Sequence, residues 1–211
     1  MSLSLQTFPA GPLETNAYLV IDDETGHALV IDAPPGVTPA LTATIADGGY
    51  TVDQIVITHA HWDHIVDAAP LRDALGVPVL AHPLTQDRLA NPGNSTQDLP
   101  FTITPITPDA WLNDGDSVTL GEHTFLVMHL PGHDPAHIVL YSAADKMILG
   151  GDVLFPGGHG TTEIPGSDQA VMNQSLARLA ILPGDVTVYP GHGVSTTLGA
   201  EASWLKGGGQ P

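Results

Sequence analysis

Residues 58–64 of this chain read Thr58-His59-Ala60-His61-Trp62-Asp63-His64. The apolar run Gln54–Thr58 leads into them and predicts a buried strand. In an extended segment residues i and i+2 face the same way, so His59 and His61 could grip one ion while Asp63 and His64, turning into a helix, face a neighbouring position. Imidazole and carboxylate without thiolate suit zinc, iron, manganese or nickel. The alternative, a merely polar helix start, would leave several costly polar groups to satisfy.

Further polar residues occupy the same kind of position, directly after a predicted strand. Thr124–Leu130 leads to His133, Met147–Leu149 to Asp152, and Val186–Tyr189 to His192. Together with the strand before His59, these strand ends can converge on one edge of a sheet, where a rigid scaffold holds polar loop residues. The pattern therefore predicts a metal site built from distant parts of the chain.

The rest of the chain alternates short apolar runs with helical patterns. Besides the strands above, we expect strands at Ala17–Ile21, Ala28–Ile31, Val77–Ala81, Ser117–Leu120 and Ile138–Tyr141, and helices at Thr38–Ala46, Ile65–Leu75 and Gln169–Leu182. The proline-rich stretch Asn91–Asp109 is interpreted as a long surface connection, because the elements on either side are too few to form independent domains. Both halves contain strands followed by a helix, which predicts an α/β sandwich in one domain over residues 1–211.

Composition narrows the classes of function. The 211 residues include 23 Asp and Glu against 5 Lys and Arg, a formal net charge of −18, so we expect neither a nucleic-acid nor a membrane partner. The absence of cysteine excludes a disulfide scaffold, a thiolate nucleophile and an iron–sulfur cluster. The first 18 residues have no basic region typical of a signal peptide, and no long apolar run follows, which favours a cytoplasmic location.

The whole arrangement resembles the metallo-β-lactamase superfamily, in which an HxHxDH segment is followed by a His, an Asp and a last His, each after a strand. Val30-Ile31-Asp32 is similar to the family's early strand end, and Pro190-Gly191-His192-Gly193 to its last ligand motif. The stretches Pro108–Asp116, Gly151–Gly158 and Tyr189–Gly193 resemble those of single-domain, glyoxalase II-like bacterial thioesterases, which hydrolyse hydroxyacyl-glutathione thioesters. The resemblance implies a four-layer αββα sandwich and a binuclear metallohydrolase.

Carried over residue by residue, the resemblance implies one metal on His59, His61 and His133 and a second on Asp63, His64 and His192, bridged by Asp152. The cofactors implied are two divalent transition metal ions, zinc first, with iron or manganese as alternatives. Catalysis would then depend on Asp63 and Asp152. Asp32 has no ligand role in the family, and we expect it to fix the 59–64 loop from outside the metal site.

The chemistry expected follows from such a pair of metals. Coordination lowers the pKa of water from about 15.7 toward 7, so a hydroxide is present at neutral pH to attack a carbonyl carbon. A thiolate leaving group, whose conjugate acid has a pKa of about 8.5, departs without a general acid. An amide nitrogen needs protonation. The sequence therefore favours a small-molecule thioester substrate over a β-lactam.

Some residues depart from the glutathione-dependent relatives. Thr161, in Gly158-His159-Gly160-Thr161, stands where those relatives place a basic residue that contacts glutathione, and we expect no helical C-terminal domain such as completes their glutathione pocket. Asp134 follows His133 where the family often has threonine. We therefore expect anionic glutathione thioesters to bind weakly.

The remaining histidines have open interpretations. His159 could contact substrate or metal, or be a solvated turn residue, and His137 could support the metal site or simply pack. We expect His27, His82, His123 and His129 at surface or strand positions.

Three other functions fit the same sequence pattern. A persulfide dioxygenase has the same fold and HxHxDH segment but binds a single iron through two His and an Asp, and a lactonase would use the same binuclear site. A metal-buffering or interaction protein is the non-enzymatic alternative, although buffering does not need ligands placed at several strand ends. The acyl group, the thiol carrier and the oligomeric state stay open.

Overall fold

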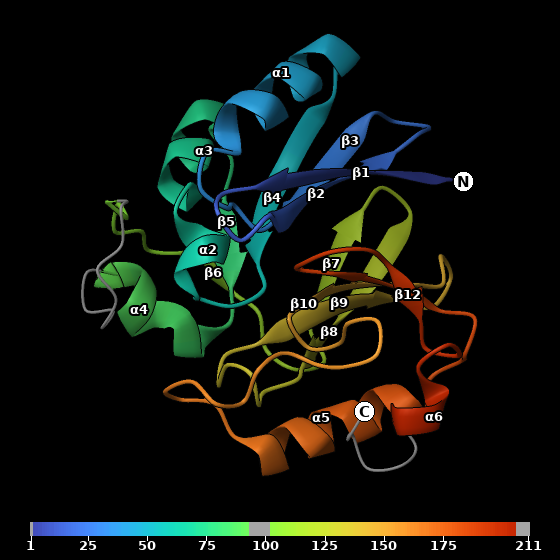
Figure 1. The fold of residues 1–211 in the computed structure, drawn as a ribbon. Coiled ribbons are helices and arrows are strands. Elements are labelled where there is room, and N and C mark those ends of the chain that lie inside the picture. Colours follow the sequence, from blue (N-terminus) through green and yellow to red (C-terminus); the bar gives the residue numbers. More distant parts are fainter. Residues whose placement is uncertain (1, 93–101, 206–211) are drawn as a thin grey trace.

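The structure is a computed structural model that describes residues 2–92 and 102–205. Two mixed sheets face each other at its centre, and helices cover the outer side of each sheet (Figure 1). The helices α1 (Thr38–Gly48) and α3 (Ala68–Leu75) lie over one sheet, and α5 (Gln169–Ala180) and α6 (Ala202–Leu205) over the other. This arrangement is the αββα sandwich expected from the sequence.

The first sheet holds the strands of the N-terminal half. In spatial order they are β1 (Leu3–Ala10), β2 (Thr15–Asp22), β3 (His27–Ile31), β4 (Thr51–Ile57), β5 (Val79–Ala81) and β6 (Ala110–Trp111). β1 to β3 pair antiparallel, whereas β3 to β6 run parallel. Parallel neighbours require crossover connections, which α1, α2 (Trp62–Ile65), α3, the 3₁₀ turn η1 (Pro83–Thr85) and α4 (Gln86–Ala90) supply.

The second sheet holds the strands of the C-terminal half. In spatial order they are β12 (Thr196–Thr197), β11 (Thr187–Pro190), β10 (Met147–Gly151), β9 (Ile138–Ser142), β8 (His123–His129) and β7 (Ser117–Leu120). Only β10 and β11 are parallel neighbours, and α5 lies in the connection between them. The carboxyl ends of β10 and β11 therefore meet at the same edge of this sheet.

Three apolar layers hold the sandwich together, one between the sheets and one under each helical layer. Every residue of β2 is buried because both of its faces are covered. Leu19 and Ile21 pack toward α1 and α3, whereas Tyr18 and Val20 pack between the sheets, as the two-residue period of a strand requires.

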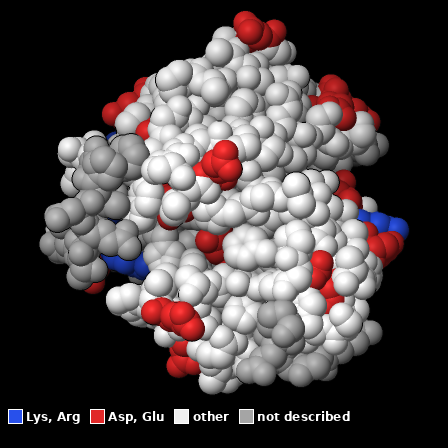
Figure 2. All heavy atoms as spheres, viewed as in Figure 1, with Lys and Arg blue, Asp and Glu red and all other residues white. Residues whose placement is uncertain are grey.

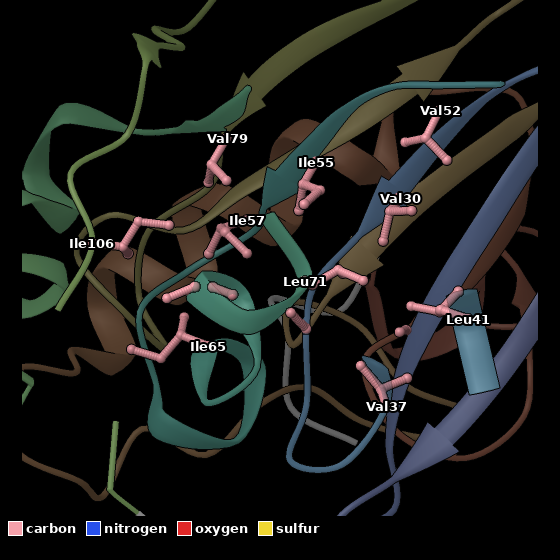
Figure 3. Close-up of a cluster of buried hydrophobic side chains, with 14 of the residues drawn as sticks. Val30, Val37, Leu41, Val52, Ile55, Ile57, Ile65, Leu71, Val79 and Ile106 are labelled. Atoms are coloured by element: carbon pink, nitrogen blue, oxygen red, sulfur yellow. The ribbon is translucent and has the colours of Figure 1, made fainter. Parts of the chain in front are cut away.

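The helix-covered layer of the N-terminal half is drawn in Figure 3. The side chains of Ile55 and Val30, from neighbouring strands, lie beside Leu71 of α3 and Leu41 of α1. Burying a leucine or isoleucine of this kind contributes about 1.5–3 kcal/mol. These contacts anchor β4, the strand that leads into the histidine-rich loop.

The predicted helix Ile65–Leu75 is wrong in one respect, because the chain forms two helices there, α2 and α3. Asp67, between them, has φ −93° and ψ 7° and does not continue the helix. Its carboxylate accepts hydrogen bonds from the backbone N–H and the hydroxyl of Thr38 at the start of α1. A tertiary contact thus breaks a pattern that locally reads as one helix.

The proposed surface connection Asn91–Asp109 also needs correction where the structure describes it. Ile106 is buried in the core, and its backbone N–H donates to the carbonyl of Leu89 at 2.9 Å. The side chain of Ile106 packs in the core of the N-terminal half, away from water. The connection then leads directly into the edge strand β6. Residues 93–101 lie outside the described part.

The strand β1, which pairs with β2 along its whole length, was not among the expected elements.

Charged side chains on the molecular surface are mostly acidic. Figure 2 shows Asp and Glu atoms scattered over the face drawn, with Lys and Arg atoms only toward its edges. Within the described residues, no helix combines the length and apolar character needed to cross a lipid bilayer.

Candidate metal centre

The ends of β4, β8, β10 and β11 converge as the sequence analysis expected. His59, His61 and His133 form one group whose ligand atoms all lie within 4.8 Å of one another, and we name it cluster one. Asp63, His64 and His192 form a second group within the same limit, named cluster two. Asp152, after β10, makes a further group with His59 and His64, and so lies between the two clusters.

The side chains of the 59–64 loop reach both clusters because the backbone changes direction once, where the extended segment ends and a helix begins. His61 is extended, with φ −71° and ψ 145°, and precedes the short helix α2. The backbone N–H of His64 donates to the carbonyl of His61 at 3.0 Å and closes the first turn. His59 and His61 therefore stay on one side of the bend, and Asp63 and His64 reach the other.

The distances between side-chain atoms are those of ligands grouped around small central positions. In cluster one, His59 Nε2 lies 2.9 Å from His61 Nδ1. In cluster two, Asp63 Oδ2 lies 3.5 Å from His64 Nε2 and 3.3 Å from His192 Nε2. Asp152 faces both clusters, since Oδ2 lies 3.5 Å from His133 Nε2 and 3.3 Å from His192 Nε2.

Buried polar atoms without hydrogen-bond partners mark the same place. The described residues contain five such side-chain atoms, and three belong to these clusters or to the residue between them: His64 Nε2, His133 Nε2 and Asp152 Oδ1. An unpaired buried polar atom costs about 1–3 kcal/mol. Metal coordination would satisfy all three, so these residues fit a binuclear site for transition metals.

Four of the five imidazoles in the clusters have the outer ring nitrogen held by a protein oxygen. His59 Nδ1 lies 3.0 Å from Thr58 Oγ1, His64 Nδ1 2.7 Å from Asp32 Oδ2, His133 Nδ1 2.8 Å from the Thr161 carbonyl, and His192 Nδ1 3.0 Å from the Leu13 carbonyl. In each ring Nε2 is then left for the cluster. Such outer partners fix the tautomer and orientation of metal-ligating histidines.

Asp32 has the supporting position expected for it. Its carboxylate accepts hydrogen bonds from the backbone N–H and the hydroxyl of Thr58, each at 2.8 Å, and also contacts His64. The residue is buried, with φ 59° in the left-handed region, a conformation that costs about 1–3 kcal/mol in a non-glycine residue. The surrounding contacts hold Asp32 there against this strain.

Two rings of cluster one, those of His59 and His61, favour the neutral form. Burial, together with the neighbouring imidazoles, lowers the pKa of His61 to about 4 and that of His59 well below its usual value. At neutral pH these rings carry lone pairs free to coordinate a metal.

Cluster two favours a protonated His192 beside an ionised Asp63. Burial opposes protonation of His192, but contacts with Asp152 and Asp63 outweigh it and raise the pKa of His192 to about 10. Burial likewise opposes ionisation of Asp63, yet hydrogen bonds from His192 and Thr15 and the charge of His64 lower its pKa to about 2. The carboxylates favour the ionised form, so a metal cation that enters cluster two would have to displace the proton that they stabilise on His192.

Three residues of β2 support the site, and the sequence analysis missed them. The Thr15 hydroxyl donates to Asp63 Oδ2 at 2.7 Å. The Asn16 amide donates to the carbonyls of Pro190 and Gly193, and the Tyr18 hydroxyl donates to Pro190 at 2.6 Å. Polar residues at the start of a strand that is otherwise apolar were the available signal.

His137 supports the site rather than merely packing. Its ring is fully buried, and Nε2 accepts a hydrogen bond from the backbone N–H of Asp152 at 2.9 Å. The ring also stacks on His59, with 4.8 Å between the ring centroids. His137 thereby ties the loop that carries Asp152 to the 59–64 loop.

The other histidines lie outside the two clusters. His159 contacts the Gly160 carbonyl and the Gln169 amide. His27 is an exposed strand residue beside Asp53, His123 begins β8 beside Asp145, and His82 stacks on His129. His27, His123 and His129 agree with the surface or strand placement expected for them. The expectation for His82 is wrong, because His82 is buried between β5 and η1, where its ring accepts a hydrogen bond from the backbone N–H of Leu84.

An open cleft of about 440 Å³ leads to the clusters. It is lined by His133, Asp152, Phe155, Gly160, Thr161, His192 and Gly193. Glycine is required close by, because a Cβ at position 191 would collide with the Asp152 carboxylate and one at position 160 with the Asp152 carbonyl. The cleft gives a small molecule access to both clusters.

Comparison with known proteins places this geometry in a family. A family model described as the metallo-beta-lactamase superfamily matches residues 10–192. The hydroxyacylglutathione hydrolase GloC of Haemophilus influenzae is 31% identical over 86% of this chain and 85% of its own length. The crystal structure of the BLEG-1 B3 metallo-beta-lactamase has a TM-score of 0.86 at 33% identity, covering 95% of this chain and 97% of that one.

A second solved relative was crystallised with metal. TTHA1623 in a di-iron-bound form has a TM-score of 0.80 at 38% identity, covering 93% of this chain and 96% of that one. The family match, these relatives, the αββα sandwich and the histidine–aspartate clusters agree. The chain belongs to the metallo-β-lactamase superfamily of metallohydrolases.

Proposed function

We propose that this protein is a binuclear metallohydrolase that cleaves a small-molecule thioester in the cytoplasm, acting as a single domain. The observation that carries the proposal is the pair of clusters sharing Asp152 at the base of one open cleft. A lone binding site would not require a second complete ligand set beside the first.

The proposed roles follow from the contacts. Cluster one would hold one ion and cluster two the other, with Asp152 between them. Two such ions would supply a hydroxide nucleophile at neutral pH and polarise the substrate carbonyl. Asp63 is held by the Thr15 hydroxyl, and the backbone of Asp152 by His137, so both catalytic carboxylates are fixed before substrate arrives.

The residues around the cleft favour thioester cleavage. The pKa of Asp63 is lowered to about 2 and that of Asp152 lies well below its usual value, so neither holds a proton at neutral pH. Among the residues lining the cleft, no other side chain is a carboxylic acid, and His192 would have lost its Nε2 proton once it bound a metal. A thiolate leaves without protonation, whereas an amine does not. This supports a thioester over an amide.

The same lining argues for weak binding of glutathione thioesters. None of the lining residues is Lys or Arg, and Thr161 stands where the glutathione-dependent relatives place a basic residue. The net charge of −18 would repel an anionic substrate further. A missing charge-assisted hydrogen bond corresponds to about 1.5–3 kcal/mol. We therefore infer a high KM for S-lactoylglutathione.

The first experiment combines elemental analysis with turnover of a thioester, a lactone, a β-lactam and glutathione persulfide. We expect close to two transition metals per chain and fastest turnover of the thioester. Zinc is our first choice, and the di-iron-bound relative also supports iron. A single iron with oxygen consumption on the persulfide would overturn the proposal in favour of a dioxygenase.

The second experiment compares Thr161→Arg with Thr119→Arg, which adds the same charge at an exposed position of the edge strand β7. Thr161→Arg should lower the KM for S-lactoylglutathione by roughly ten- to a hundredfold with a smaller change in kcat. Thr119→Arg should change KM little at high salt. A wild-type KM already in the micromolar range and insensitive to salt would refute weak glutathione binding.

One observation favours a second candidate, hydrolysis of a β-lactam. A solved relative named as a B3 metallo-beta-lactamase shares 33% identity and nearly its whole length with this chain. Turnover of a β-lactam in the same panel, at a rate above that of every thioester, would shift the function to this candidate.

A further inference from the structure

Asp134 carries a fully buried carboxylate whose only cationic partner among the described residues is Arg88 of α4. Arg88 donates from both terminal nitrogens, to Oδ2 and, at 2.7 Å, to Oδ1. The backbone N–H of Ala136 donates to Oδ1 as well, at 2.7 Å. The chain contains only 5 Lys and Arg in total, and one of them pairs with this buried carboxylate.

The other side of Asp134 faces cluster one. Its Oδ2 lies 3.5 Å from His61 Nε2, while His61 Nδ1 points the opposite way, 2.9 Å from His59 Nε2. His61 is thus the one imidazole of the two clusters that presents Nδ1 inward. Of the five rings, only His61 has an arginine–carboxylate pair rather than a hydroxyl, a carbonyl or Asp32 at its outer nitrogen.

We propose that Asp134 and Arg88 are positioning residues that hold His61 as the Nε2–H tautomer with Nδ1 directed into cluster one. The carboxylate oxygen lies on the side of the ring where it can accept a hydrogen bond from Nε2–H, which leaves the Nδ1 lone pair directed inward. Arg88 fixes the plane of the carboxylate through two parallel hydrogen bonds and compensates its charge, without which a buried carboxylate would be strongly destabilising. The inference rests on the proposed role of His61 as a metal ligand.

The pair also explains why α4 lies close to the site although it contributes no ligand. α4 follows β5 and η1 in the first sheet's half of the chain, and Arg88 links it to the loop after β8 in the other sheet. The two loops that supply cluster one are thereby clamped from outside the cleft. Loss of the clamp should loosen cluster one and leave cluster two unchanged.

The first test uses nitrogen NMR of the histidine rings in metal-free wild-type protein. We expect His61 to be protonated on Nε2 and not on Nδ1. A dominant Nδ1–H tautomer would overturn the proposal, whatever any variant does.

The second test measures the affinity of each cluster for zinc by chelator competition in Arg88→Gln and in the double variant Arg88→Met with Asp134→Leu. The double variant replaces the ion pair by apolar groups of similar size, a change that buried pairs often tolerate. We expect the affinity of cluster one to fall about 10- to 100-fold and that of cluster two to stay within about twofold. Asp134→Asn, which keeps an acceptor oxygen, should lose less.

Arg178→Gln is the matched control, because Arg178 pairs with Asp114 in a half-exposed ion pair on the surface. It should leave both affinities unchanged. Wild-type zinc affinity and an Nε2–H His61 in the folded double variant would refute the inference. Failure of wild-type protein to bind zinc at cluster one would instead refute the proposed function.

Discussion

Cluster one and cluster two are neighbours, yet the histidine pKa values shift in opposite directions: His61 in cluster one has a lowered pKa and His192 in cluster two a raised one. Cluster one contains only imidazoles, and burial among other imidazoles lowers the pKa of His61 to about 4. Cluster two contains Asp63 and faces Asp152, and these carboxylates raise the pKa of His192 to about 10 despite burial. The first cluster is ready to accept a cation at neutral pH, whereas the second must release protons to do so.

The largest effect is expected from Asp152→Ala, because Asp152 is shared by both clusters. The variant should lose both metals and roughly a thousandfold or more in kcat/KM, since several kcal/mol of transition-state stabilisation disappear. Elemental analysis and kinetics measure both quantities. Asp185→Ala, which removes an exposed carboxylate paired with Lys146, is the control. Near-normal rates in Asp152→Ala with metal bound would disprove the shared role.

Asp63→Ala should separate the clusters. It removes a carboxylate from cluster two only, so the metal content should fall from two ions toward one, and the rate by roughly a hundredfold or more. Elemental analysis after dialysis and circular dichroism would check content and fold. Loss of both metals in a folded protein would show that the clusters are not independent.

Lowering the pH should weaken cluster two before cluster one. Below a pKa of about 10, His192 carries a proton that an incoming metal must displace, so affinity falls about tenfold per pH unit for each proton displaced. His61, with a pKa lowered to about 4, competes with no proton until the pH approaches that value. Zinc titrations between about pH 8 and pH 6 measure both affinities. A parallel decline in the two clusters would contradict the comparison.

The smallest effect is expected from His27→Ala. His27 lies outside both clusters, and its ring, about half exposed, contacts Asp53 at 2.6 Å on the surface. Exposed pairs of this kind contribute about 0–1 kcal/mol, so metal content and turnover should stay at wild-type values and the free energy of unfolding should change little. A loss of metal in this variant would mean that surface histidines, and not the clusters alone, recruit the ions.

The fold was largely predictable where local pattern and tertiary environment agree. Short apolar runs bounded by glycine, proline and aspartate marked most strands, and α1 and α5 lie within two residues of their predicted ends. Prediction failed at β1, whose half-exposed residues form no continuous apolar run, and at Asp67, whose carboxylate binds the start of α1 instead of continuing a helix. In both cases the deciding partner is distant in sequence.

The site residues were likewise predictable where they are close in sequence or follow strands. Thr58 to His64 lie together in sequence, so spacing alone indicated two adjoining metal positions. The strand ends before His133, Asp152 and His192 indicated convergence, because carboxyl ends of neighbouring strands share an edge. The assignment of each residue to one ion remains a prediction, and the geometry is consistent with it.

The sequence by itself determined an α/β sandwich and which residue types gather at one edge, because these follow from short-range periodicity and ligand chemistry. The resemblance of its motifs to a known family implied the αββα layers. Only the tertiary structure decided which oxygen holds the outer nitrogen of each imidazole, how Thr15 supports Asp63, and that Arg88 reaches Asp134. Such contacts join strands and loops far apart along the chain. Their geometry depends on how two sheets pack, and no local pattern encodes it.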